Sequence, residues 1–156
     1  MKYIRKASAK DASRLAEILV FAKRVQYRPI FHDDKVSFGE IQVLPLAQAY
    51  LANPETLETI WVYDDMFVKG MIHVEDSQIQ ELYVDPFFQG QGIGSHLIDF
   101  AIRECHAGHL FVLEKNDQAI RFYQKHGFVL TKTRQLEPGT PEYIVKMERQ
   151  IILPDS

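Results

Sequence analysis

Residues 81–97 read Glu81-Leu82-Tyr83-Val84-Asp85-Pro86-Phe87-Phe88-Gln89-Gly90-Gln91-Gly92-Ile93-Gly94-Ser95-His96-Leu97. A strand-like run ends at Pro86, glycines follow at positions 90, 92 and 94, and a helical pattern begins directly after them. Glycine lets the backbone turn tightly and approach a ligand closely, and a helix start offers unpaired N–H groups and the positive end of a dipole. Together these features predict a cradle for an anion, most often a phosphate.

The spacing of the glycines excludes two common phosphate-binding motifs. A P-loop requires a lysine after its last glycine, and none follows here. A dinucleotide fingerprint requires Gly-x-Gly-x-x-Gly, but the third glycine is replaced by Ser95 or Leu97, depending on the register. The remaining pattern is Gln89-x-x-Gly92-x-Gly94 after a strand, for which the alternative is an ordinary glycine-rich turn.

A second informative segment reads Leu113-Glu114-Lys115-Asn116-Asp117-Gln118-Ala119-Ile120-Arg121-Phe122-Tyr123-Gln124-Lys125-His126-Gly127-Phe128. Asn116 is a favourable helix N-cap, and Gly127 suits the position that ends the helix. Ala119, Ile120 and Tyr123 fall on one side at helical spacing. The alternative interpretation is a plain amphipathic helix that carries a packed tyrosine.

These two segments, in this order, resemble the acetyl-CoA-binding motifs of the GNAT superfamily of N-acetyltransferases. The resemblance covers residues 1 to about 150, although only residues 81–128 are specific to the motifs. It implies an α/β fold, with a mixed, mostly antiparallel sheet flanked by helices. It also implies acetyl-CoA as co-substrate and an acyl-CoA-dependent transferase activity toward an amine.

The hydrophobic pattern predicts the element order β-α-α-β-β-β-α-β-α-β-β. The expected strands span residues 3–6, 57–63, 66–75, 79–85, 109–114, 127–133 and 143–149, and the expected helices span residues 9–27, 44–51, 92–106 and 117–125. In the first helix, the buried stripe is expected to comprise Ala12, Leu15, Ile18, Leu19, Ala22 and Val25. Asp64-Asp65 is expected to form a hairpin turn. We expect one domain over residues 1–150 and a C-terminal tail over 151–156.

The resemblance also assigns candidate site residues. It implies that backbone groups of the glycine loop bind the pyrophosphate, that Leu82–Val84 pairs with the pantetheine arm, and that Asn116 contacts that arm. The implied cofactor-binding residues are Leu82, Tyr83, Val84, Gln89, Gly90, Gln91, Gly92, Ile93, Gly94, Ser95, Asn116, Ala119 and Tyr123.

Two of the candidate residues are expected to be catalytic. By resemblance, Tyr123 lies near the sulfur of the cofactor as general acid, with a packed tyrosine as the alternative. Glu81 shares a strand face with Tyr83 and is the candidate general base or acceptor ligand, with a solvent-facing carboxylate as the alternative. His73 and Glu75 share one face of the preceding strand, and His73 could titrate near neutral pH.

The composition fits an ordinary globular protein and excludes several classes. The chain has 156 residues with 46% apolar and 25% charged residues, and its net charge of −3 argues against a nucleic-acid partner. No apolar run is long enough for a membrane span, and the N-terminus lacks a signal-peptide core, so we expect a cytoplasmic protein. One cysteine, Cys105, excludes an internal disulfide and is expected to be a buried structural thiol. The histidines show no metal-ligand spacing. A Ser-His-Asp or Cys-His mechanism finds no support, because direct transfer needs no covalent enzyme intermediate.

The acceptor is the least constrained part of the prediction. It is expected to bind between residues 27–51 and 135–142, of which the first segment contains Phe31, His32, Asp33, Asp34, Phe38 and Glu40. Acids and aromatics suit a cationic amine, either small or on a peptide, although ordinary loop composition is the alternative. The resemblance allows a homodimer, to which Ile151-Ile152-Leu153 could contribute. A non-catalytic acyl-CoA sensor and transfer to oxygen also remain open.

Overall fold

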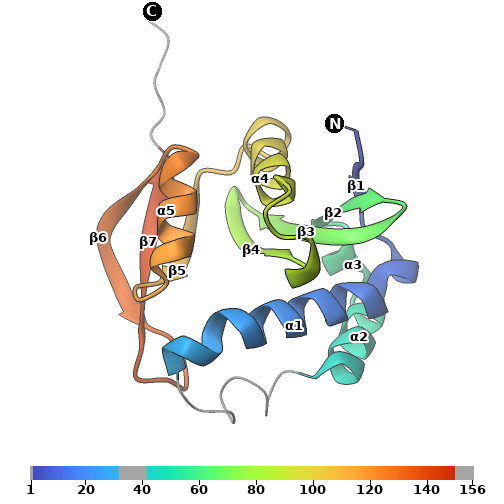
Figure 1. Ribbon diagram of the computed structural model, residues 1–156, viewed down its shortest axis with the longest axis horizontal. Helices are drawn as coiled ribbons and strands as arrows, with labels where there is room; N and C mark the ends of the chain where they lie inside the picture. The colour runs from blue at the N-terminus through green and yellow to red at the C-terminus, as the bar shows by residue number, and fades with distance from the viewer. Residues whose placement is uncertain (1, 32–41, 150–156) are drawn as a thin grey trace, which may run out of the picture.

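The computed structural model describes residues 2–31 and 42–149, with residues 27–31 described by their backbone alone. Its strands are β1 (Ile4–Lys6), β2 (Ile60–Asp65), β3 (Phe67–Glu75), β4 (Gln78–Val84), β5 (His109–Leu113), β6 (Phe128–Leu136) and β7 (Tyr143–Arg149). Its helices are α1 (Ala12–Phe31), α2 (Val43–Ala52), α3 (Pro54–Leu57), α4 (Ile93–Glu104) and α5 (Asp117–Lys125), with short 3-10 turns η1 (Ala9–Asp11) and η3 (Pro86–Phe88). The predicted α/β class and the order of the main elements are confirmed (Figure 1).

Three local predictions differ from the structure. The expected strand at residues 57–63 begins only at Ile60, because Pro54 at the first helical position starts α3 instead. The expected turn at Asp64-Asp65 lies within β2, since Met66 takes the left-handed conformation, with φ 70°, that the tight connection needs. The first helix also begins with the turn η1 and continues to Phe31, past the expected end at residue 27.

The sheet has the order β1-β2-β3-β4-β5-β7-β6. Antiparallel ladders join all neighbours except β4 and β5, which pair in parallel. That parallel contact consists of Gln78 opposite His109 and Ile79 opposite Leu110. The remaining residues of β4 and β5 continue without pairing to each other, so the sheet opens between them.

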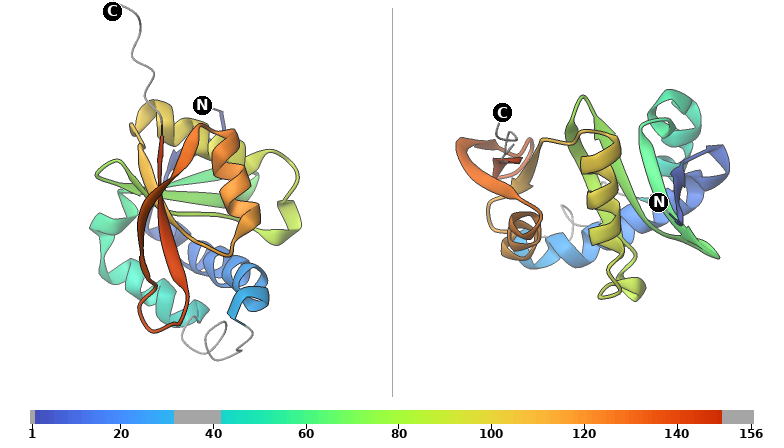
Figure 2. Two further views of the ribbon diagram at one scale, coloured as in Figure 1. Left: turned by 90° about the vertical axis from the view of Figure 1, so that its left-hand side faces the viewer. Right: turned by 90° about the horizontal axis from the view of Figure 1, so that it is seen from above.

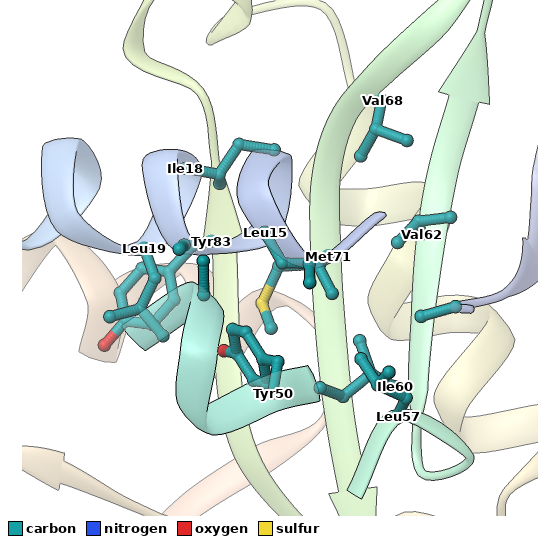
Figure 3. Packing of buried hydrophobic residues seen from close by; sticks show 14 of the residues in the cluster. Leu15, Ile18, Leu19, Tyr50, Leu57, Ile60, Val62, Val68, Met71 and Tyr83 are labelled. Atoms are coloured by element: carbon teal, nitrogen blue, oxygen red, sulfur yellow. The ribbon is translucent and has the colours of Figure 1, made fainter. Parts of the chain in front are cut away.

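Helices cover both faces of the sheet. Helices α1 and α2 pack on one face, where the core includes Leu15, Ile18, Leu19, Tyr50, Val62, Met71 and Tyr83 (Figure 3). Helix α4 packs on the other face, and its buried side chains Ile93, Leu97, Ile98 and Ala101 meet residues of β3, β5, β6 and β7. Figure 2 shows the two layers of helices from the side and from above. No helix among the described residues is long and apolar enough to span a membrane.

Two residues that were predicted to be buried on apolar helix faces are more exposed than expected. Val25 is 60% exposed, because it lies beyond the part of α1 that the sheet covers. Cys105 is half-buried at the end of α4 rather than fully enclosed, and burial raises the pKa of its thiol. Both residues still follow the helical periodicity from which they were predicted.

Gly70 of β3 brings α4 close to the sheet. A Cβ atom at this position would lie 3.0 Å from Cγ2 of Ile93 and 3.2 Å from the carbonyl oxygen of Tyr83. These distances are shorter than ordinary van der Waals contact, so a side chain at position 70 would push α4 outward. The glycine therefore sets the height at which the first turn of α4 sits above β4.

Candidate active site

A cavity of about 580 Å³, here called the loop cavity, lies between the residues 88–95, the N-terminal part of α5 and the end of α1. All but one of the predicted cofactor-binding residues line it: Leu82, Tyr83, Val84, Gln89, Gly90, Gly92, Ile93, Gly94, Ser95, Asn116, Ala119 and Tyr123. Gln91 is exposed and is not among the lining residues. The two predicted motifs, which are separated in the sequence, thus face one hollow.

A second cavity of about 530 Å³, here called the gap cavity, occupies the opening between β4 and β5. Glu81 lines it, together with Lys23 of α1 and with Gln135, Glu137, Pro138 and Thr140 near the β6–β7 connection. Both cavities share Gln26, Leu82, Tyr83, Asn116, Ala119 and Tyr123. The two hollows therefore meet at β4 and Tyr123, so that a molecule in one can reach a molecule in the other.

The glycine loop has the backbone geometry that its sequence predicts. Gly90 and Gly92 have φ values of 82° and 80°, in the left-handed region that favours glycine. Gly92 is the N-cap of α4, so the first N–H groups of the helix follow it directly. These groups open onto the loop cavity, which gives the positive end of the helix dipole access to an anion.

A buried ion pair fixes the start of this loop. Asp85 is the N-cap of η3, and its Oδ1 accepts the backbone N–H of Phe87 at 2.9 Å. Its Oδ2 accepts a hydrogen bond from Nη2 of Arg14 at 2.6 Å, and the Nε of the same arginine donates to the carbonyl oxygen of Val68. The Asp-Pro step after β4 is thereby attached to both α1 and β3, which positions the glycines that follow.

Asn116 and Tyr123 are held by local contacts on α5. The Oδ1 of Asn116 accepts the backbone N–H of Ala119 at 3.2 Å, which confirms the predicted N-cap. The ring of Tyr123 packs edge-on against the rings of Phe122 and Phe128, at 5.4 Å and 6.0 Å between centroids. Gly127 ends the helix with φ 91°, as expected. These contacts leave Tyr123 half-buried where the two cavities meet.

Glu81 lies between two nitrogen-bearing side chains. Its Oε2 is 3.9 Å from Nζ of Lys23, and its Oε1 is 3.8 Å from Nδ1 of His73, which faces it across β3 and β4. The other ring nitrogen of His73, Nε2, is 3.3 Å from Oε1 of Glu75 but is not aligned for a hydrogen bond. Burial lowers the pKa of His73, but the two carboxylates outweigh this effect, and the net shift is upward. Glu81 is therefore not a simple solvent-facing residue.

The charge of Glu81 also affects the pKa of Tyr50, a buried tyrosine of α2. Burial raises the pKa of Tyr50, and the nearby carboxylate of Glu81 raises it further. Figure 3 shows Tyr50 among the apolar side chains between α2 and β3. The phenol thus stays neutral in its apolar surroundings.

The sequence did not reveal two contributions to the site. Helix α1 contributes the lining residues Ala22, Val25 and Gln26 to the loop cavity. Which residues of α1 face this cavity depends on how the helix packs against the sheet, so the sequence alone did not identify them. Asp99, His126 and Ser95 form a chain of contacts that the sequence analysis did not single out. A spacing of four residues between Ser95 and Asp99 was the available signal, but the pairing with His126 is long-range. The candidate acceptor residues His32, Asp33, Asp34, Phe38 and Glu40 lie outside the described residues.

Comparison with known proteins agrees with this geometry. A family profile described as "Acetyltransferase (GNAT) domain" matches residues 56–130. The peptidyl-lysine N-acetyltransferase YjaB of Salmonella typhimurium is 31% identical over 101 residues, which covers 59% of this chain and 70% of YjaB.

Solved structures share the fold. The solution structure of apo-form YjaB from Escherichia coli matches with a TM-score of 0.68 at 24% identity, and covers 93% of this chain and 95% of that chain. The structure of YncA from Salmonella typhimurium with its cofactor acetyl-CoA matches with a TM-score of 0.64 at 21% identity, and covers 98% and 97%. From its motifs, its fold and these relatives, the chain belongs to the GNAT family and is an acyl-CoA-dependent acetyltransferase.

Proposed function

We propose that this protein transfers the acetyl group of acetyl-CoA to a primary amine, by direct attack within a ternary complex, and that a lysine side chain of a peptide is the acceptor. The observation that carries this proposal is the opening between β4 and β5, where the loop cavity and the gap cavity meet. Such a passage lets two substrates approach one reacting carbon from opposite sides. No covalent enzyme intermediate is then required.

Backbone groups would hold the acetyl donor. The N–H groups of residues 90–95 are suited to the pyrophosphate, and the edge of Leu82–Val84 on the side away from β3 is suited to the amide-containing pantetheine arm, in the manner of an added strand. A backbone N–H near Val84 would donate to the thioester oxygen as negative charge develops on it. Asn116, whose Oδ1 caps α5, would use its amide group on the same arm.

Two side chains would move the protons. A lysine amine has a pKa of about 10.4 and must be neutral to attack, so Glu81, in the wall of the gap cavity, would accept its proton. After the C–N bond forms and the C–S bond breaks, the phenol of Tyr123 would donate a proton to the departing thiolate. Tyrosine has a pKa of about 10 and a thiol one of about 8.5, so this transfer depends on the fixed position of Tyr123.

Two observations favour a peptide acceptor. The relative YjaB carries the name of a peptidyl-lysine N-acetyltransferase, and the gap cavity extends to the connection between β6 and β7. Glu137 and Glu81 line this cavity and would attract the cationic side chain. A small cationic amine is the second candidate acceptor, and a non-catalytic acyl-CoA sensor is the alternative to an enzyme.

The test is thiol release from acetyl-CoA with matched acceptors. One peptide carries a single lysine and a blocked N-terminus, a second carries arginine instead of the lysine, and a third has a free N-terminus without lysine; spermidine serves as the small amine. We expect thiol release and an acetylated lysine, identified by mass spectrometry, with the first peptide. Release with spermidine alone would replace the peptide by a small amine. Acetyl-CoA binding without release to any acceptor would favour the sensor.

The remaining expectations accompany this proposal. A cytoplasmic location follows from the use of acetyl-CoA as an intracellular metabolite, and the homodimer stays a prediction. The residues expected to contribute to a dimer, Ile151-Ile152-Leu153, lie outside the described residues.

A further inference from the structure

A serine, a histidine and an aspartate from two helices form a continuous chain at the edge of the loop cavity. The Oγ of Ser95, in the first turn of α4, is 3.2 Å from Nε2 of His126. The Nδ1 of the same ring is 3.3 Å from Oδ1 of Asp99, one turn further along α4. His126 is the C-cap of α5, so the chain joins the two helices that border the cavity.

The surroundings hold this arrangement in place. The His126 side chain is only 16% exposed, and its ring lies 4.8 Å from the ring of Phe122 of its own helix. From α4, the charged group that faces the ring is Asp99, whose side chain is 44% exposed. Because a carboxylate oxygen only accepts hydrogen bonds, the position of Asp99 favours the form of the ring that carries its hydrogen on Nδ1.

The direction of the hydrogen bond at Ser95 then depends on the charge of His126. In the neutral ring with its hydrogen on Nδ1, Nε2 is an acceptor and uses the hydroxyl hydrogen of Ser95. In the charged ring, Nε2–H donates to Oγ, and the hydroxyl hydrogen is free to donate elsewhere. Ser95 lines the loop cavity, so its freed hydrogen can point to an anion there.

We propose that His126, held by Asp99, is a positioning residue that turns the Ser95 hydroxyl into a donor for the cofactor's pyrophosphate and takes up a proton when the cofactor binds. This inference rests on the proposed placement of the pyrophosphate at the glycine loop. We assign no nucleophilic role to Ser95, because it lines the loop cavity next to the glycines, whereas the proposed acid and base line the gap cavity.

A thermodynamic consequence follows. If binding is tighter to the protonated protein, binding must itself take up protons, because the coupling is reciprocal. The affinity should therefore fall as the pH rises through the range in which histidine side chains lose their charge. A linked proton allows at most about a tenfold weakening per pH unit.

The experiment is calorimetric titration of the full chain with dephospho-CoA, which keeps the pyrophosphate but lacks the 3′-phosphate monoester that itself titrates near pH 6. Titrations near neutral pH in two buffers of different ionisation enthalpy count the protons taken up. Further titrations over about pH 5.5–8 give the pH dependence of the dissociation constant. For the unmodified protein we expect proton uptake and an affinity about fivefold or more weaker at the upper end.

Two variants test the assignment, one at His126 and one at its partner Asp99. His126→Gln keeps a side-chain donor near Ser95 but does not titrate, and Asp99→Asn removes the charged partner of the ring. We expect both to bind without the proton uptake and with a flattened pH profile, whereas His109→Gln on β5 should behave like the unmodified protein. A purely structural link would weaken binding equally at every pH.

The outcomes separate this inference from the proposed function. Equal proton uptake by the unmodified protein and His126→Gln would overturn the role of His126 and leave the cofactor site standing. Absence of dephospho-CoA binding by the unmodified protein would overturn the pyrophosphate placement, and the inference with it.

Discussion

Backbone pairing is extensive among the strands on each side of the sheet's opening, but it is sparse between the two sides. On one side, β2, β3 and β4 pair along nearly their whole length, with β1 added to β2. On the other side, β7 pairs with every residue of β5 and also with β6. Between the first group, β1–β4, and the second, β5–β7, there are two paired positions (Figure 1). Each group is thus complete in itself, and the junction is the weakest part of the sheet.

This difference shows how the fold creates a site without losing its core. Helix α4 packs over residues from both groups, so the apolar cluster beneath it holds them together where the backbone does not. The proposed base, Glu81, comes from the first group, and the proposed acid, Tyr123, follows β5 on α5. The chemistry is therefore expected at the junction, where neither group can supply it alone.

The largest expected effect is the loss of CoA binding when a charged side chain is placed in the glycine loop. Gly92→Glu forces a side chain into a left-handed conformation, which costs about 1–3 kcal/mol, and places a negative charge where an anion should bind. We expect CoA affinity to fall at least about a hundredfold, measured by calorimetry. The matched control is Gly139→Glu, since Gly139 has φ 77° but lies outside the loop cavity. Tight CoA binding by Gly92→Glu would remove the pyrophosphate from this loop.

A pair of arginine variants compares burial in the two groups. Arg14→Ala leaves the Asp85 carboxylate, whose side chain is 8% exposed, without its charged partner, and should lower the free energy of unfolding by about 3 kcal/mol. Arg134→Ala removes an equally direct pair with Glu114, but that carboxylate is 46% exposed, so the loss should be under about 1 kcal/mol. Urea denaturation measures both. Equal losses would show that burial does not decide these contributions.

The contribution of the second group to catalysis is tested by Tyr123→Phe. Removal of the phenol hydroxyl should lower kcat about a hundredfold, as expected for loss of a general acid, while CoA affinity changes little because the ring packing is kept. Steady-state thiol release at saturating acceptor measures the rate. The control is Tyr143→Phe, because the ring of Tyr143 is exposed and stacks with Arg134. An unchanged kcat would exclude Tyr123 from proton transfer.

The smallest effect concerns His73, between Glu81 and Glu75. Because its pKa is raised in the folded protein, its charge stabilises the fold below the unfolded value of about 6.5 and this contribution disappears as the pH rises through the folded value. Compared with His73→Gln, the unmodified protein should therefore have an advantage of about 1 kcal/mol in acid that shrinks toward alkaline pH. Denaturation at both pH values measures it, with His109→Gln as control. A constant difference would contradict the raised pKa.

Local signals predicted the fold better than the site. Asn116 and Gly127 mark the ends of α5 through interactions within a few residues, so they could be recognised from the sequence. The turn at Met66 could not, because a residue with no preference for a positive φ occupies it. At the site, the glycine loop is local and was predicted, whereas Arg14 with Asp85, and His126 with Ser95, meet only after the chain has folded back on itself.

The opening between β4 and β5 also bears on aggregation. An unpaired strand edge is ordinarily a template on which another chain can add a strand, with fibrils as the extreme result. Here Leu82–Val84, which do not pair with β5, line the loop cavity, and Ala22, Val25 and Gln26 of α1 line the same cavity. Under the proposed function, the narrow pantetheine arm of the cofactor is the chain that would add to this edge. The enzyme would thus use, for its own substrate, a strand edge on which another copy of the chain can otherwise add a strand.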